Sequence, residues 1–131
     1  MTLRELIDGV SKIKGWKVLS EEGVTGFSVP QAGNRHQFVV MSEFRDEAHP
    51  MVRFTTRIGP VDRLESNRLR SALELNLRLP HGCLATDGVH LVMTGTRPLG
   101  TTTSQTTADA IQFIAHQADQ YEKLIFNTDV H

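Results

Sequence analysis

The sequence predicts an α+β fold in which helices pack on an antiparallel sheet of five to six strands, in the order α-β-β-β-β-α-β-β-α. Three observations lead to this prediction. Apolar residues recur at helical spacing near both ends of the chain, short β-prone runs lie between them, and Glu22-Gly23 and Asp87-Gly88 are suited to tight hairpin turns. The 131 residues, 39% of them hydrophobic, suffice for one domain with a packed core.

The first helix is expected to begin directly after Thr2. Thr2 and Glu5 have the spacing of a capping box, apolar residues recur at helical intervals over residues 3–13, and Gly15 is a typical helix stop. This pattern predicts a short amphipathic helix.

Four strands are expected to follow. Residues 16–19 and 24–29 are β-prone runs on either side of the first hairpin turn. Residues 37–44 are apolar on both faces near their middle, which is typical of a strand in the centre of a sheet. A loop is expected over residues 45–50, and residues 51–58 then alternate as a half-buried antiparallel strand would.

A second helix is expected over residues 63–78. Residues 73–79 alternate as in a strand, but the segment is rich in helix formers, and Asp62 and Glu65 have capping-box spacing. The apolar residues of this helix cover an arc of about 220°, wider than one core-facing stripe requires. They are Leu64, Leu69, Ala72, Leu73, Leu75, Leu77 and Leu79. We therefore expect the helix to contact a second surface.

Two more strands are expected over residues 82–86 and 89–97, because they flank the strong hairpin dipeptide Asp87-Gly88. A final helix is expected to be capped by Thr106 and Asp109. One face of that helix carries Ala110, Ile111, Ile114, Ala118, Tyr121 and Ile125.

The chain contains no interdomain linker or internal repeat, so residues 1–131 are expected to form a single α+β domain. The last residues, from Asn127, are expected to fray.

Composition indicates a cytoplasmic protein. The net charge is −1, which gives no broad field toward nucleic acid or anionic lipid. Cys83 is the only cysteine, so an intramolecular disulfide is excluded. The N-terminus has acidic residues where a signal peptide needs an apolar run, and no stretch is apolar over the 18 residues that suggest a spanning helix.

No reaction motif is present. The six histidines do not occur at metal-ligand spacing, Cys83 has no helix N-terminus beside it to activate its thiol, and the glycines do not form a phosphate-binding motif. We therefore predict no catalytic residue, no metal site and no cofactor.

A basic strand face is the remaining candidate for a binding site. Arg53 and Arg57 share one face of the strand over residues 51–58, and Arg35, Arg78 or Arg97 are candidates to extend it. Such a patch suits phosphate, an acidic peptide or nucleic acid. Nucleic acid is disfavoured because only 6% of the residues are aromatic and few are available for base stacking.

The second half of the chain resembles the YbjN-like family and the related type III secretion chaperones. The resemblance rests on Leu73-Glu74-Leu75-Asn76 at a helix end, Leu84-Ala85-Thr86-Asp87-Gly88 at a hairpin, Arg97-Pro98-Leu99 after the next strand, and Ala118-Asp119-Gln120-Tyr121 in the last helix. It covers residues 64–125, and the first half is similar only in its order of a helix followed by strands. It implies an α+β domain that often dimerises and binds proteins, with no catalytic residues.

The resemblance and the wide apolar arc together predict a homodimer with Leu64, Leu75 and Leu79 at its interface. The alternative is that strands bury this helix within one subunit. The leading interpretation is a noncatalytic protein-binding or chaperone-like regulatory domain of the bacterial cytosol. Two others are binding of nucleic acid or a phospho-ligand through Arg53 and Arg57, and a small enzyme that uses dispersed histidines and carboxylates.

Overall fold

A computed structural model describes residues 1–126. The helices are α1 (Leu3–Lys14), α2 (Ser66–Leu75) and α3 (Ser104–Ile125), with short 3₁₀ turns at Ala32–Asn34 and Val61–Arg63. The strands are β1 (Lys17–Glu21), β2 (Val24–Pro30), β3 (His36–Asp46), β4 (His49–Pro60), β5 (Cys83–Thr86) and β6 (His90–Pro98). This order confirms the predicted α+β fold. The predicted fraying from Asn127 lies outside the described residues.

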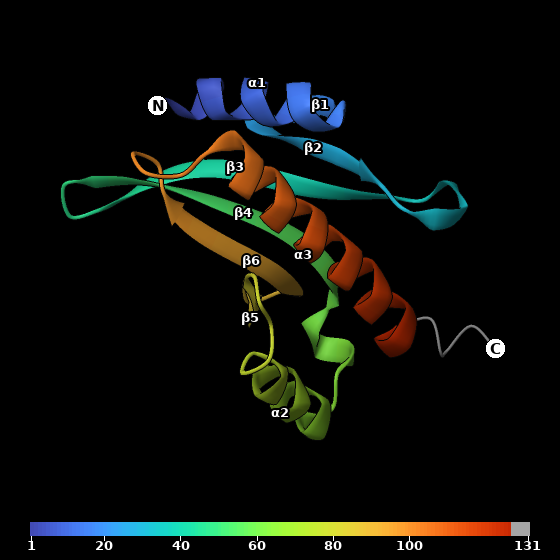
Figure 1. Ribbon diagram of the computed structural model, residues 1–131. Helices are drawn as coiled ribbons and strands as arrows, with labels where there is room; N and C mark the ends of the chain where they lie inside the picture. The colour runs from blue at the N-terminus through green and yellow to red at the C-terminus, as the bar shows by residue number, and fades with distance from the viewer. Residues whose placement is uncertain (127–131) are drawn as a thin grey trace.

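All strands form one antiparallel sheet in the order β1-β2-β3-β4-β6-β5, so β1 and β5 are its edges. The helices α1 and α3 lie over one face, α1 near β1 and β2, and α3 diagonally across β3, β4 and β6 (Figure 1). Helix α2 lies at the far end of the sheet and contacts β5.

The core lies between the sheet and the two helices α1 and α3. Alternate residues of the central strands point into it and are almost completely buried, among them Phe27, Val39, Val52 and Phe54. Helix α3 contributes the predicted apolar stripe: Ala110, Ile111, Ile114 and Ala118 are buried, and Tyr121 and Ile125 pack against the cluster. Burial of this stripe is what fixes α3 on the sheet.

Local signals identified the ends of α1 and the turn between β1 and β2 correctly. The Thr2 hydroxyl accepts the Glu5 N–H and the Glu5 carboxylate accepts the Thr2 N–H, which completes the predicted capping box. Gly15 ends the helix in the left-handed conformation, with φ of 71°. Glu22 and Gly23 both have positive φ, as a type I′ hairpin turn requires.

The connection between β3 and β4 differs from the prediction. The loop expected over residues 45–50 is instead a tight hairpin, in which only Glu47 and Ala48 separate β3 from β4. Glu47 adopts a left-handed conformation, with φ of 56°, which allows the shorter turn although the residue is not a glycine.

The ends of α2 also differ from the prediction. Asp62 lies in the 3₁₀ turn, and the helix begins after Glu65, whose side chain makes no capping hydrogen bond. The α-helix ends at Leu75, but the N–H groups of Leu77 and Arg78 donate to the carbonyls three residues earlier, so a tighter turn continues to Arg78. The Asn76 side chain reaches β5, where it accepts the Leu84 N–H and donates to the Leu84 carbonyl.

The start of α3 is earlier than predicted. Thr103 is the N-cap, and its hydroxyl accepts the Thr106 N–H, so Thr106 closes the capping box rather than opening the helix. Within residues 1–126, no helix is both long enough and apolar enough to span a membrane.

Candidate functional site

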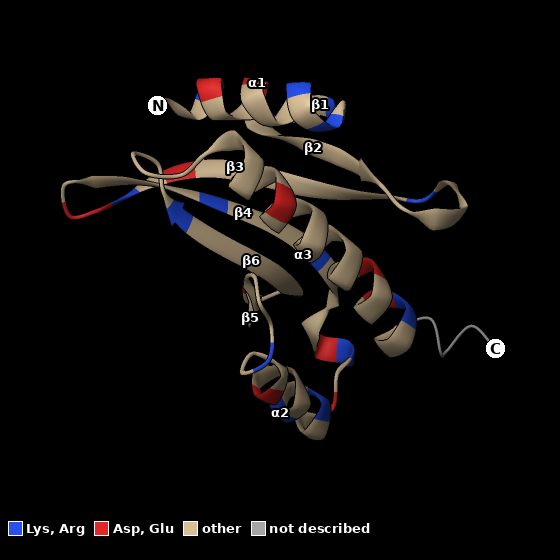
Figure 2. Cartoon of the chain, viewed as in Figure 1, with Lys and Arg blue, Asp and Glu red and all other residues tan. Residues whose placement is uncertain are grey.

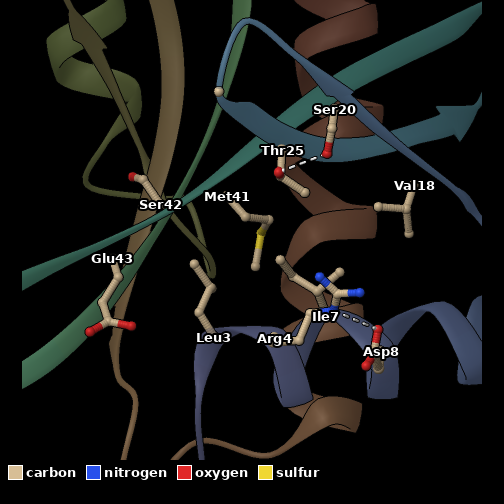
Figure 3. Close-up of a pocket in the computed structure, with 11 residues that line it drawn as sticks. Leu3, Arg4, Ile7, Asp8, Val18, Ser20, Thr25, Met41, Ser42 and Glu43 are labelled. Atoms are coloured by element: carbon tan, nitrogen blue, oxygen red, sulfur yellow. Dashed lines mark hydrogen bonds and ion pairs between the residues drawn. The ribbon is translucent and has the colours of Figure 1, made fainter.

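A groove of about 630 Å³ lies between α1 and the first three strands (Figure 3). Leu3 and Ile7 reach it from α1, Val18 from β1 and Met41 from β3, and these side chains form its apolar surface. Leu3 and Ile7 are neighbours one helical turn apart. Ile7 belongs to the buried core cluster and Leu3 packs against it, so the groove lies at the margin of the core. The remaining lining residues are Arg4, Asp8, Ser20, Gly23, Thr25, Ser42 and Glu43.

Charged side chains lie along the rim of this groove. Arg4 and Asp8 form an exposed ion pair at 3.8 Å on the solvent side of α1, and Glu43 extends from β3 on the opposite side. Inside, the hydroxyls of Ser20 and Thr25 are hydrogen-bonded to each other at 2.9 Å. The groove therefore combines an apolar floor with a polar rim, as polypeptide-binding surfaces do.

The strand β1 borders the groove and is an edge of the sheet. Its five residues are exposed or half-exposed, and Val18, with 40% of its surface accessible, points toward the groove. The outer backbone edge of such a strand can pair with an added strand, while alternate side chains of that strand would fill the neighbouring groove. The groove and the edge together are suited to an extended polypeptide segment.

The groove lining contains no histidine and no cysteine. Across residues 1–126, no three histidine, cysteine or acidic side chains are grouped so that they would hold a metal ion. The chemistry that the groove offers is apolar contact, backbone pairing and charge at the rim.

The structure places Arg53 and Arg57 together on the sheet face opposite α1 and α3, as the sequence predicts for one strand face. Both side chains are exposed. The Arg53 guanidinium lies 4.1 Å from the centre of the Phe44 ring, which is a cation–π contact between β4 and β3. This face is a second candidate surface.

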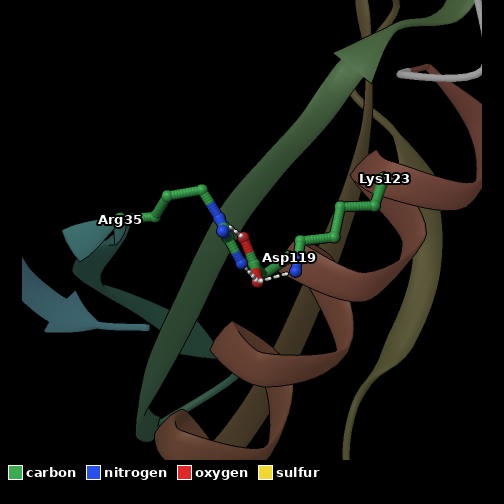
Figure 4. A network of polar contacts seen from close by, with 3 residues as sticks. All are labelled: Arg35, Asp119 and Lys123. Carbon is green, nitrogen blue, oxygen red and sulfur yellow. Dashed lines mark hydrogen bonds and ion pairs between the residues drawn. The ribbon is translucent and has the colours of Figure 1, made fainter. Parts of the chain in front are cut away.

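Two other arginines do not join that face. Arg35 makes a bidentate ion pair with Asp119 of α3, at 3.1 and 2.8 Å, and Lys123 approaches the same carboxylate at 3.8 Å (Figure 4). Arg97 is opposite Val52 in the β4–β6 register, which puts it on the face covered by the helices.

Asp119 is a buried carboxylate that the sequence prediction overlooked. Its hydrogen bonds from the Arg35 guanidinium hold the pKa of Asp119 below its ordinary value, although burial opposes this. Burial raises the pKa of the neighbouring Glu122, and the charge of Asp119 raises it further. A signal was available, because Asp119 interrupts the buried stripe of α3 directly after Ala118, and a buried carboxylate needs a cation.

The leucines predicted for the second helix, in α2 and on either side of it, fall into two sets that differ in exposure. Leu64, Leu75 and Leu79 are half-buried and pack against the core. Leu73 and Leu77, on the other side, are 68% and 90% exposed. Between α2 and β5 lies an apolar hollow of about 240 Å³, lined by Leu69, Ala72, Leu73, Leu84, Ala85, Thr86 and Leu91. Arg78 is exposed three residues past the end of α2, the helix that lies beside β5 and not on β4.

The sequence reasoning missed the groove beside α1. Its lining comes from residues 3–43, on one helix and three strands, and only the register of these strands brings them together.

The geometry defines an antiparallel α+β domain with a groove beside an edge strand, and comparison with known proteins agrees on the fold. No family model matches the sequence, and no curated protein matches it. A solved structure of the Yersinia pestis type III secretion chaperone SycH, in complex with a stable fragment of YscM2, superposes with a TM-score of 0.65 at 14% sequence identity. The match covers 91% of this chain and 98% of that one.

This likeness confirms the predicted resemblance to the type III secretion chaperone fold. At this level of sequence identity it shows the fold alone. The resemblance to the YbjN-like family stays a prediction.

Proposed function

We propose that this protein is a noncatalytic, chaperone-like protein-binding domain of the cytoplasm that holds an extended polypeptide segment in the groove between α1 and β1–β3. The observation that carries the proposal is the apolar groove lying directly beside the free edge of β1. The segment would extend the sheet at β1 and place alternate side chains against Leu3, Ile7 and Val18.

The structural likeness supports a protein as the bound partner. SycH was solved with a fragment of another protein bound to it, and its fold spans nearly the whole of this chain. The apolar floor of the groove favours a polypeptide with apolar side chains over a small charged metabolite.

Site-specific crosslinking tests this function. A photoreactive amino acid at Val18 is expected to crosslink a polypeptide in cells, because this side chain points into the groove. The matched control is the same amino acid at Ile13 of α1. Ile13 is 44% exposed, close to the 40% of Val18, but it does not line the groove. The substitution Thr25→Trp blocks the groove and should reduce the adducts at Val18. Adducts that this substitution does not affect, or equal labelling at Ile13, would contradict the proposal.

A homodimer through α2 is the second part of the proposed function. Leu64, Leu75 and Leu79 were the predicted interface, and their packing leaves them only partly exposed. Leu73 of α2 and Leu77, two residues past its end, are more exposed, and Leu73 also lines the apolar hollow beside β5. A second copy of the chain would cover apolar surface that costs free energy in water.

A further inference from the structure

The sheet face opposite α1 and α3 exposes apolar side chains in a continuous area. Phe38 on β3 is 38% exposed and Val24 on β2 is 41% exposed, and Val40 beside them is half-buried. These residues line a hollow of about 570 Å³ that extends to Arg57 and Val92. Val92 is buried but is not part of the core cluster, since its side chain lies on this outer face.

Two cations lie in the middle of this face without a carboxylate partner. Arg53 and Arg57 alternate with Thr55 on β4, and neither guanidinium has an ion pair or hydrogen bond with any other group in residues 1–126. Arg53 is exposed and contacts Phe44 through a cation–π interaction, so its N–H groups are available to a carboxylate. Their positions, four residues apart in a strand, separate them by about 13 Å.

The carboxylates of this face lie at its margins. Glu21 lines the hollow from β1, and Asp87 lines it from the turn between β5 and β6. Asp87 is already engaged, because its carboxylate accepts the N–H groups of Val89 and His90, which lowers its pKa. Figure 2 shows cations and carboxylates interspersed over the chain. The cations of this face are Arg53 and Arg57 on β4 and, by the strand registers, Lys17 on the edge strand β1.

We propose that this outer sheet face is a docking surface for an acidic, amphipathic segment of a partner protein, separate from the groove beside α1. Apolar side chains of the segment lie on Phe38, Val24 and Val40, and its carboxylates pair with Arg53 and Arg57. Glu21 and Asp87, at the margins of this face, repel a segment that is acidic at its ends. They therefore favour a segment whose acidic residues lie over β4.

A protein segment fits this face better than nucleic acid does. Nucleic-acid binding at physiological salt depends on many phosphate contacts, whereas this face provides Arg53, Arg57 and Lys17 at its edge, with Glu21 and Asp87 beside them. Exposed Phe38 and Val24 offer apolar area that a phosphate backbone would not use.

Peptide display tests the proposal on the full chain. Selection from a random library of peptides about 12 residues long is expected to enrich sequences that combine two or more acidic residues with apolar ones. One enriched peptide, made synthetically, is expected to lose about tenfold or more in affinity for the double variant R53E/R57E. The same peptide with lysine in place of its acidic residues should bind that variant more tightly than it binds the natural chain.

Two controls separate this surface from others. The variant K12E/R68E makes the same change of net charge at exposed helix positions and should leave the affinity within about twofold. Val18→Asp, in the groove, should also leave it unchanged, so failure of the groove function and failure of this docking surface are distinguishable. Thermal unfolding of each variant checks that the fold is retained.

The proposal is overturned if the selection enriches no acidic peptide or if R53E/R57E binds the enriched peptide as well as the natural chain does. It is equally overturned if a double-stranded DNA oligonucleotide binds at physiological salt and R53E/R57E abolishes that binding.

Discussion

Arg35 and Asp119 are joined by two parallel hydrogen bonds across 84 residues of sequence. Arg35 follows the short 3₁₀ turn between β2 and β3, and Asp119 lies in the last third of α3. The Asp119 side chain is 7% exposed, whereas that of Arg35 is 41% exposed. The pair therefore fastens the β2–β3 connection to the helix that covers the sheet, with the anion buried and the cation reaching in from solvent.

Substitution of Asp119 by asparagine is expected to destabilise the fold by about 1–2 kcal/mol, because the ionic hydrogen bonds from Arg35 are lost while the shape is kept. Urea denaturation measures the change. The control is Asp109→Asn on the same helix, where the carboxylate is exposed and accepts only from Gln105. Equal stability of the two variants would show that the buried ion pair contributes nothing.

The contribution of Asp119 also depends on pH. Arg35 lowers the pKa of Asp119 in the folded state, so the unfolded chain takes up the proton at a higher pH, near the ordinary value of about 3.9. The stabilisation is therefore complete above about pH 5 and is lost as the pH falls through the depressed folded-state value. The difference in unfolding free energy between the natural chain and Asp119→Asn should shrink between about pH 5 and pH 3, and a constant difference would contradict this account.

Gly26 is expected to be intolerant of a side chain. A Cβ atom at this position would lie 2.2 Å from the Val39 carbonyl oxygen, which belongs to the backbone of the paired strand β3 and cannot move aside. Gly26→Ala should cost about 2 kcal/mol or more, measured by thermal or urea unfolding. At Gly100 a Cβ atom would meet no other atom within 4 Å, so Gly100→Ala should change stability by no more than about 0.5 kcal/mol.

The same unfolding curves test the prediction that residues 1–131 form a single domain. One cooperative transition, seen alike by fluorescence and circular dichroism, is expected. Two separated transitions would contradict the prediction of a single domain.

The features that the sequence predicted well depend on short stretches of chain. The Thr2 capping box and the hairpin at Asp87-Gly88 are each determined within a few residues, and both form, although the turn of the hairpin also includes Val89. The hydrogen bonds of Asn76 to Leu84 of β5 were not predicted, because they exist only once the sheet has formed.

The candidate site was predicted less well for the same reason. Arg53 and Arg57 are on one face because a strand alternates, which the sequence reveals directly. The groove beside α1 requires the registers of β1, β2 and β3, and the pairing of Arg35 with Asp119 requires the placement of α3. Such long-range relationships have no local signature in the sequence.

Self-association is the last property that the structure makes testable. Leu73 and Leu77 are the exposed leucines of α2 and its C-terminal end, so they can be changed without opening the core, unlike Leu64, Leu75 and Leu79. The variant L73E/L77E is expected to convert a dimer into a monomer at micromolar concentration, because two carboxylates would be buried at the interface without partners. Light scattering coupled to size exclusion measures the mass directly. Leu124→Glu, at a leucine of α3 that is 64% exposed, should leave the mass unchanged. If the natural chain is already a monomer at micromolar concentration, the dimer proposal is wrong, and the exposed leucines of α2 need another explanation.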